Sequence, residues 1–270
     1  MPAQFAASGN ERWLKNNTAQ CADYFLKKFV VTIDITAKPC YIVVVTSKVT
    51  IKQNQFTEVN IMKLAVVAAN GRTANKVIDE AVKRGFDVTA FGRGENNTKA
   101  QTYVQKDLFD LTAEDVKDFD AVVDAFGAWT EETFPLHTTS LMHICDILSG
   151  TDTRLLVVGG AGSLYVNPEH TMQVSDTPDF PDAFKPLAAA MAAALEKLRE
   201  RKDIKWTYIS PAGDYQADGE RTGEYILAGE ELTLNERGES IISYADYAIA
   251  MVDEIEKGGH IQQRISVVRK

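Results

Sequence analysis

The stretch that decides the fold is MKLAVVAANGRTANKVIDEAVKRG, residues 62–85. Its apolar run at residues 64–67 predicts a buried strand, and a tight turn follows at residues 68–72. Apolar residues then recur with the spacing of one helix face, at Ala74, Val77, Ile78, Ala81 and Val82. Gly85 follows, where the end of a helix favours a residue without a Cβ atom. The stretch therefore predicts a strand, a turn and a helix in direct succession.

Such a turn brings unpaired backbone N–H groups and the positive end of a helix dipole to one point. That point suits the pyrophosphate of a dinucleotide. The usual pattern, G-x-G-x-x-G, is only partly present, because its positions hold Ala68, Asn70, Gly71 and Ala74. Alanine is sterically mild there, and we expect Asn70 to tolerate left-handed backbone angles. Taken alone, the turn also fits an ordinary strand-to-helix connection, so its neighbours must decide.

The segments that follow alternate between strand and helix patterns. Strand patterns occupy residues 86–91, 102–106, 120–127, 154–160 and 204–211, and helix patterns occupy residues 131–149 and 182–201. The last helix carries an apolar stripe, formed by Phe184, Leu187, Ala188, Met191, Leu195 and Leu198. Alternation of this kind predicts an α/β fold with a doubly wound parallel sheet and right-handed crossovers.

The end of the second predicted strand indicates the cofactor. An acidic residue at this place holds the ribose 2′-OH of NAD, whereas an arginine accommodates the 2′-phosphate of NADP. This chain has Arg93 there and no acid before Glu95. The sequence therefore favours NADP, and NAD stays open as the alternative.

Seven motifs in a fixed order carry a family resemblance: AANGRTA (68–74), KDLFD (106–110), VVDAFG (122–127), RLLVVGGAGS (154–163), WTYISP (206–211), RTGEY (221–225) and SYADYAIAMVDE (243–254). Residues 62–270 resemble an atypical short-chain dehydrogenase/reductase of the NAD(P)H-binding, NmrA-like branch that includes NADH-flavin reductases. The resemblance implies a Rossmann-like domain with a small C-terminal substrate lobe and an oxidoreductase activity. The odd number of cysteines does not suggest a disulfide framework, so a reduced, cytoplasmic compartment is expected.

The resemblance also implies the cofactor site, lined by Ala69, Asn70, Gly71, Arg72, Thr73, Arg93, Ala125, Phe126, Gly127 and Pro211. Asp107 matches the family position whose carboxylate meets the adenine amino group, with a turn-capping role as the alternative. In the lobe we expect Tyr215, Arg221 and Tyr225, a hairpin over residues 232–242 that turns at 236–238, and a helix N-cap at Ser243.

The catalytic residues are harder to find. Ser163 stands where the family has its catalytic serine, but no Tyr-x-x-x-Lys follows in the next helix, which starts Phe184-Lys185-Pro186-Leu187. Without that general acid, the sequence favours hydride transfer to a small acceptor such as a flavin or quinone, for which solvent supplies the proton. The alternative is a catalytically silent, NADPH-sensing regulatory protein; an epimerase-like activity is disfavoured because the Tyr–Lys pair is missing.

Composition excludes other classes of function. The chain has 270 residues and a net charge of −9, with no basic stripe, so no nucleic-acid partner is expected. Its three cysteines lack metal-binding spacing, and His137 and His143 lie six residues apart, so no metal site is expected. A small-molecule acceptor is the expected partner, and a homodimer or a regulatory protein partner stays open.

Residues 1–61 do not fit this fold. Their apolar runs at residues 29–36 and 41–46 are too interrupted for a membrane helix, so no membrane partner is expected. Thr57-Glu58-Val59 can be encoded by ACG-GAG-GTN, which resembles a bacterial ribosome-binding site just before Met62. We therefore expect residues 1–61 to lie outside the fold, as the product of a mis-assigned start or as an engineered or disordered leader. A small β element or an oligomerisation arm is the alternative.

Overall fold

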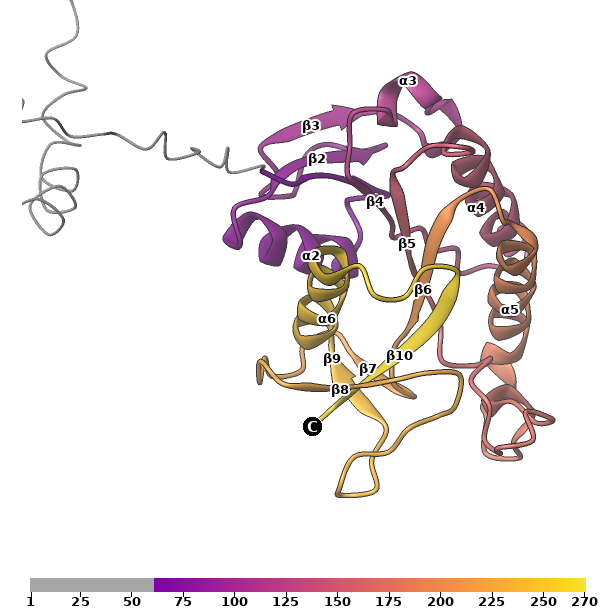
Figure 1. The fold of residues 1–270 in the computed structure, drawn as a ribbon. Helices are drawn as coiled ribbons and strands as arrows, with labels where there is room; N and C mark the ends of the chain where they lie inside the picture. The colour runs from indigo at the N-terminus through magenta and orange to yellow at the C-terminus, as the bar shows by residue number, and fades with distance from the viewer. Residues whose placement is uncertain (1–60) are drawn as a thin grey trace, which may run out of the picture. The chain divides into compact units, whose positions relative to one another are not determined.

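The computed structural model of this chain describes residues 61–270, so the leader predicted at residues 1–61 lies, apart from Ile61, outside the described residues. The described part is an α/β fold built on an eight-stranded sheet with the order β3-β2-β1-β4-β5-β6-β10-β8 (Figure 1). The strands of this sheet are β1 (Lys63–Val67), β2 (Asp87–Gly92), β3 (Thr102–Gln105), β4 (Ala121–Asp124), β5 (Arg154–Val158), β6 (Lys205–Ser210), β8 (Tyr225–Ala228) and β10 (Gln263–Arg269). All neighbouring strands pair in parallel except β10 and β8, which are antiparallel. The doubly wound parallel sheet predicted from the sequence is thus confirmed.

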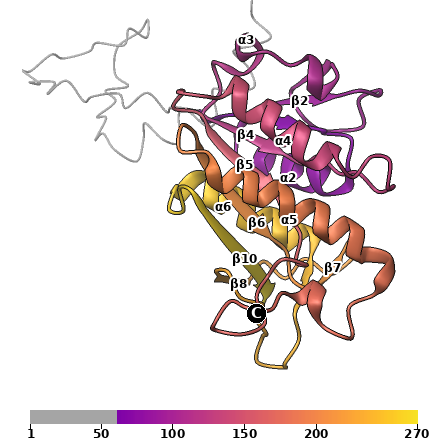
Figure 2. The ribbon, with the colours of Figure 1, turned by 90° about the vertical axis from the view of Figure 1, so that its right-hand side faces the viewer.

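Helices cover both faces of the sheet. They are α2 (Arg72–Lys83), α3 (Ala113–Val116), α4 (Leu136–Ile147), α5 (Lys185–Glu200) and α6 (Tyr244–Lys257), with short 3-10 turns η1 (Leu108–Asp110), η2 (Val174–Asp176) and η3 (Asp182–Phe184). Helices α2 and α6 pack together on one face, and α4 and α5 lie side by side on the other (Figures 1 and 2). Within the described residues, no helix is long and apolar enough to span a membrane.

The alternation of strand side chains explains these two layers. In β1, Leu64 and Val66 pack in the core under α2 and α6, whereas Ala65 and Val67 pack in the core under α4 and α5. Because successive strand residues point to opposite faces, a continuous apolar run serves a sheet that is buried on both sides.

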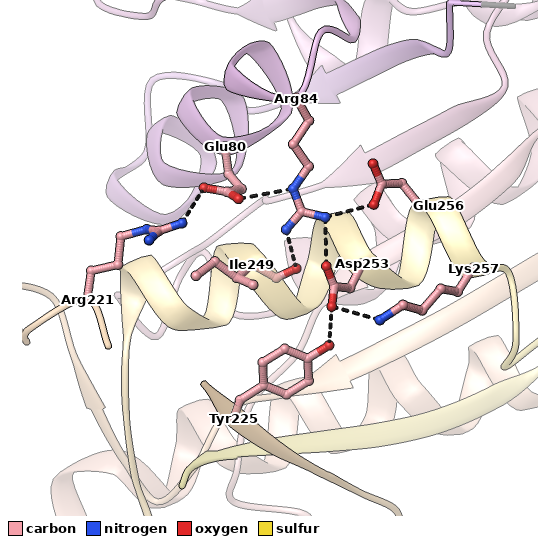
Figure 3. Close-up of polar contacts among 8 residues, drawn as sticks. All are labelled: Glu80, Arg84, Arg221, Tyr225, Ile249, Asp253, Glu256 and Lys257. Atoms are coloured by element: carbon pink, nitrogen blue, oxygen red, sulfur yellow. Dashed lines mark hydrogen bonds and ion pairs between the residues drawn. The ribbon is translucent and has the colours of Figure 1, made fainter. Parts of the chain in front are cut away.

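A partly buried ion network fastens α2 to α6. The guanidinium of Arg84, at the end of α2, donates to Glu80 at 3.0 Å, to Asp253 at 2.6 Å and to Glu256 at 2.8 Å (Figure 3). Arg221 reaches the other oxygen of Glu80 at 3.0 Å. The network holds α2, whose opposite end faces the site described below.

The C-terminal lobe differs from its prediction. The expected turn exists, because Gly238 N–H donates to Asn235 and Gly238 has a φ of 76°. However, the flanks do not pair as a hairpin. Instead β9 (Ile241–Ser243) pairs in parallel with β7 (Asp214–Gln216) as a separate two-stranded sheet. The predicted N-cap is confirmed, since Ser243 Oγ accepts from Asp246 N–H at 3.0 Å.

Candidate functional site

A cleft of about 1260 Å³ opens at the carboxyl ends of the parallel strands. The strand order reverses between β1 and β4, and ligands of open α/β sheets bind at such a switch point. The cleft wall includes the turns that follow β1, β2, β4, β5 and β6. Ten of the residues predicted to bind the cofactor line or adjoin it: Asn70, Gly71, Arg72, Thr73, Arg93, Asp107, Ala125, Phe126, Gly127 and Pro211. Ala69 is fully buried directly beneath the turn.

The turn between β1 and α2 leaves a helix N-terminus free for an anion. Gly71 is the N-cap of α2 and supplies no side-chain cap, and the first turn of the helix contains no acidic residue. Its N–H groups therefore have no carboxylate competitor, and Arg72 adds positive charge at the same place. A Cβ atom on Gly71 would lie 3.5 Å from the Ala68 carbonyl oxygen, which is ordinary contact. Glycine at this position is therefore explained by the space that it leaves open outside the turn, and not by a backbone conformation that only glycine adopts.

The left-handed residue of the turn is Ala68, with a φ of 56°, whereas Asn70, which would tolerate such angles, does not adopt them. The Asn70 side chain instead braces the turn. Its Oδ1 accepts from the Tyr103 hydroxyl at 3.0 Å, and its Nδ2 donates to the Glu95 carbonyl at 2.8 Å. A Cβ atom on Gly92 would lie only 2.2 Å from Asn70 Oδ1, so glycine at the end of β2 makes room for this brace.

Arg93 and Asp107 face each other at one end of the cleft. Arg93 is 81% exposed, and its Nε lies 3.8 Å from Asp107 Oδ2. Asp107 Oδ1 accepts from Phe109 N–H at 2.9 Å and so caps η1. The turn-capping role is therefore present, while the second oxygen of Asp107 lies toward Arg93.

The segment after β4 is fixed by Asp124. Its buried carboxylate accepts from Phe126 N–H at 2.9 Å. Burial raises the pKa of Asp124 to about 6, although the hydrogen bond from Phe126 acts in the opposite direction.

Further along, His137 donates from Nε2 to the Ala128 carbonyl at 3.1 Å, and burial lowers its pKa. The groups of three or more His, Cys, Asp and Glu that hold metals do not occur among residues 61–270.

The predicted catalytic serine does not line the cleft. Ser163 is buried, and its Oγ accepts from Arg264 Nη1 at 2.9 Å. The same nitrogen donates to the Ser163 carbonyl at 2.8 Å, and Arg264 forms an ion pair with Glu230. Tyr165 stacks on His170 with ring centroids 4.4 Å apart, and Lys185 pairs with Asp182 at 2.7 Å. The structure therefore ties Ser163 to β10 rather than to the open cleft.

Helix α5 turns an apolar face to the cleft. The residues concerned are Phe184, Leu187, Ala188 and Met191, which are the first four of the predicted stripe. Leu195 and Leu198 are buried in the core instead, so one stripe serves both a cleft wall and a core. Glycines bring the β5 turn close to this helix: a Cβ atom on Gly162 would lie 2.7 Å from Ala188 Cβ, and one on Gly160 would lie 3.0 Å from Met191 Sδ.

Aromatic residues that the sequence did not assign to the cofactor complete the wall. Trp129 lines the cleft and is 74% exposed. The rings of Tyr215 and Tyr244 pack with centroids 4.0 Å apart and a tilt of 30°, and the Tyr215 hydroxyl lies 3.1 Å from Thr73 Oγ1. Burial raises the pKa of Tyr215, so it remains a protonated phenol. Tyr215 was noted as a lobe residue, but its contact with the first turn of α2 had no signal in the sequence.

Comparison with known proteins identifies the class of cofactor. Residues 68–257 match the model of an NAD(P)H-binding family. The uncharacterized protein YwnB of Bacillus subtilis (strain 168) is 43% identical over 210 residues, which cover 77% of this chain and 98% of YwnB. A crystal structure from Streptococcus pneumoniae TIGR4, provisionally named an NADH-flavin reductase, is 56% identical with a TM-score of 0.76; the match covers 77% of this chain and all of that one. A provisionally named epimerase from Bacteroides thetaiotaomicron is 32% identical with a TM-score of 0.69, over 77% of this chain and 97% of that one.

Proposed function

The chain belongs to the NAD(P)H-binding family of atypical short-chain dehydrogenases/reductases, and from this premise we propose that it is an NADPH-dependent reductase of a small flat acceptor, a flavin or a quinone. The free helix N-terminus at Gly71 suits the pyrophosphate, and Arg93 suits the 2′-phosphate, because its planar donors match phosphate oxygens. In this proposal Asp107, which lines the cleft, meets the adenine amino group, and the turns after β4 and β6, which line it too, hold the nicotinamide end of the cofactor.

The observation that carries the proposal is the apolar face of α5. A typical short-chain reductase places Tyr and Lys four residues apart in this helix, and the tyrosine protonates the substrate oxygen. Here the pairs at that spacing that line the cleft are Phe184 with Ala188 and Leu187 with Met191. Such a wall offers no proton to a carbonyl oxygen. It suits an acceptor whose reduced form takes its proton from water.

The residues of the chain then have binding and orienting tasks. When bound, the nicotinamide supplies a hydride. The β1 turn holds the phosphates, the segment after β4 holds one side of the ring site, and α5 excludes water from the other side. The streptococcal neighbour, provisionally named an NADH-flavin reductase, supports a flavin as acceptor.

The test is steady-state oxidation of NADPH against riboflavin, FMN and menadione. Turnover that Gly71→Val lowers by roughly tenfold to a hundredfold at sub-saturating NADPH supports the proposal. NADPH binding without consumption by any acceptor would instead support the silent-sensor alternative, in which cofactor binding changes the affinity for a partner protein.

A further inference from the structure

The segment between β4 and α4 presents an exposed tryptophan at the cleft. Trp129 is 74% exposed, although a large indole is usually buried to a much greater extent. The indole lies beside Gly127, a predicted cofactor-binding residue, because a Cβ atom on Gly127 would lie 3.4 Å from the indole Nε1. An exposed indole beside the predicted nicotinamide site requires an explanation.

The backbone on both sides of Trp129 is anchored. Before it, the buried Ala128 accepts from His137 Nε2 at 3.1 Å. After it, Thr130 N–H donates to Thr133 Oγ1 at 3.2 Å, and Thr133 Oγ1 donates back to the Thr130 carbonyl at 3.0 Å. These hydrogen bonds fix the backbone that presents the exposed Trp129 indole at the cleft. Because the loop is already ordered, a planar ring that stacks on the indole costs only the freedom of the Trp129 side chain.

Charge in the cleft is unevenly distributed. Among the described residues that line it, the lysines and arginines are Arg72, Arg93 and Lys106, and these come from the β1 turn and the ends of β2 and β3. The part formed by the segment after β4, by residues 180–184 and by α5 contributes Trp129, Thr130, Thr133, Phe180, Phe184, Leu187, Ala188 and Met191, none of which is charged. A phosphate group on the acceptor would find no cation in this part.

We propose, as a refinement that rests on the proposed function, that Trp129 stacks on the acceptor ring and that the acceptor is an uncharged conjugated ring without a phosphate group, such as riboflavin or a short-chain quinone. The apolar side chains of α5 face the same space and exclude water from it. FMN then binds through its ring alone, and its phosphate remains in solvent.

The experiment compares Trp129→Ala, Trp129→Phe and the control Leu234→Ala, which truncates an exposed apolar residue that is not part of the cleft wall. Loss of the stacked ring should raise the KM for riboflavin by about threefold to tenfold, and phenylalanine should restore most of it. The Kd for NADPH should stay unchanged in all three. The kcat/KM for riboflavin should match that for FMN within about threefold, because the phosphate group adds no charged contact.

A second measurement does not depend on turnover. Riboflavin emission, which a stacked indole quenches, is titrated with each protein in the presence of NADP⁺. The parent and Leu234→Ala should quench it, and Trp129→Ala should not. Equal quenching or equal KM in Trp129→Ala overturns the stacking role, and a preference for FMN of tenfold or more overturns the uncharged acceptor. If no acceptor is reduced, the proposed function fails, while riboflavin quenching still decides whether this subsite exists.

Discussion

At the scale of single residues, Gly71 decides whether a phosphate can approach α2. Its φ of −70° and ψ of 155° suit any residue, and a Cβ atom has room, so Gly71→Val should fold normally. The added branches would occupy the space of the pyrophosphate, at a cost of about 1–3 kcal/mol, or roughly tenfold to a hundredfold in affinity. Calorimetric titration with NADPH checks this. Unchanged affinity in a variant with the parent's melting temperature would place the phosphates elsewhere.

Arg93 should set the choice of cofactor. It is exposed and 3.8 Å from Asp107, so it makes no tight internal contact that its removal would break. Arg93→Ala should weaken NADPH binding by about 1.5–3 kcal/mol, which is one to two decades, because charge-assisted hydrogen bonds to the 2′-phosphate are lost. NADH should lose far less. Equal losses for the two cofactors in parallel titrations would contradict this assignment.

Ala68 carries strain that glycine would relieve. A left-handed conformation costs roughly 1–2 kcal/mol for a residue with a Cβ atom, and Ala68 adopts it. Replacement by glycine removes this strain, but the greater freedom of glycine in the unfolded chain offsets part of the stabilisation. Ala68→Gly should therefore raise the free energy of unfolding by about 0.5–1 kcal/mol. Denaturant unfolding measures it, with Ala74→Gly in α2 as the control that should lose about 1–2 kcal/mol, because a fully buried methyl group is removed from the helix. A loss in both variants would show that Ala68 is not strained.

Replacing Ser163 distinguishes a structural role of its hydroxyl from a catalytic one. Its hydroxyl accepts from the buried Arg264, so Ser163→Ala should lower the free energy of unfolding by about 1.5 kcal/mol. The kcat should fall less than twofold, since the hydroxyl is not in the cleft wall. A fall in kcat of ~10²–10⁴, the usual worth of general acid catalysis, would instead restore Ser163 to the chemistry.

At the scale of elements, the sequence predicted what local periodicity encodes. Strands β1 to β6 and helices α2, α4 and α5 were foreseen, because buried parallel strands and amphipathic helices have short-range patterns. Strand β10 was not assigned, since its apolar run is short and is flanked by Arg264 and Arg269. Arg264 is buried through partners far along the chain, Ser163 and Glu230. Tertiary contacts also decide which residues of the α5 stripe line the cleft and which are buried in the core. The periodicity of the sequence does not reveal this division.

The site divides in the same way. The β1 turn, Arg93 and Asp107 follow from motifs at fixed places along the chain, and the structure brings them to one cleft. Trp129, Tyr215 and Tyr244 belong to three segments that meet only after folding, so no spacing announces them. Motif residues next to strand ends were thus predictable, and the aromatic residues that complete the wall from the β4–α4 segment and from the C-terminal lobe were not.

At the scale of the described domain, the network around Arg84 joins α2 to α6 and to β8. Tyr225 of β8 donates to Asp253 at 2.7 Å, so one carboxylate connects three elements (Figure 3). The side chains of Glu80, Arg84 and Asp253 are only 10–20% exposed. Removing one member therefore leaves partly buried charges without their partner, which is more costly than loss of a surface pair.

Arg84→Ala should lower the free energy of unfolding at pH 7 by about 3 kcal/mol, and this loss should shrink in acid. Burial alone would raise the pKa of Glu80 and of Asp253, but hydrogen bonds from arginines, from Lys257 and from Tyr225 outweigh it and hold both values below their usual range. The carboxylates thus stabilise the fold above their unfolded pKa values, near about pH 4, and this contribution is lost as the pH falls through their lower folded values. Unfolding curves of the parent and Arg84→Ala should therefore differ most at neutral pH and converge below about pH 4.

Lys257→Ala is the matched control, because Lys257 also contacts Asp253 but is 68% exposed and should matter little at any pH. A gap between parent and Arg84→Ala that stays constant from neutral pH into acid would show that packing of the Arg84 stem, rather than its charge, joins the two helices.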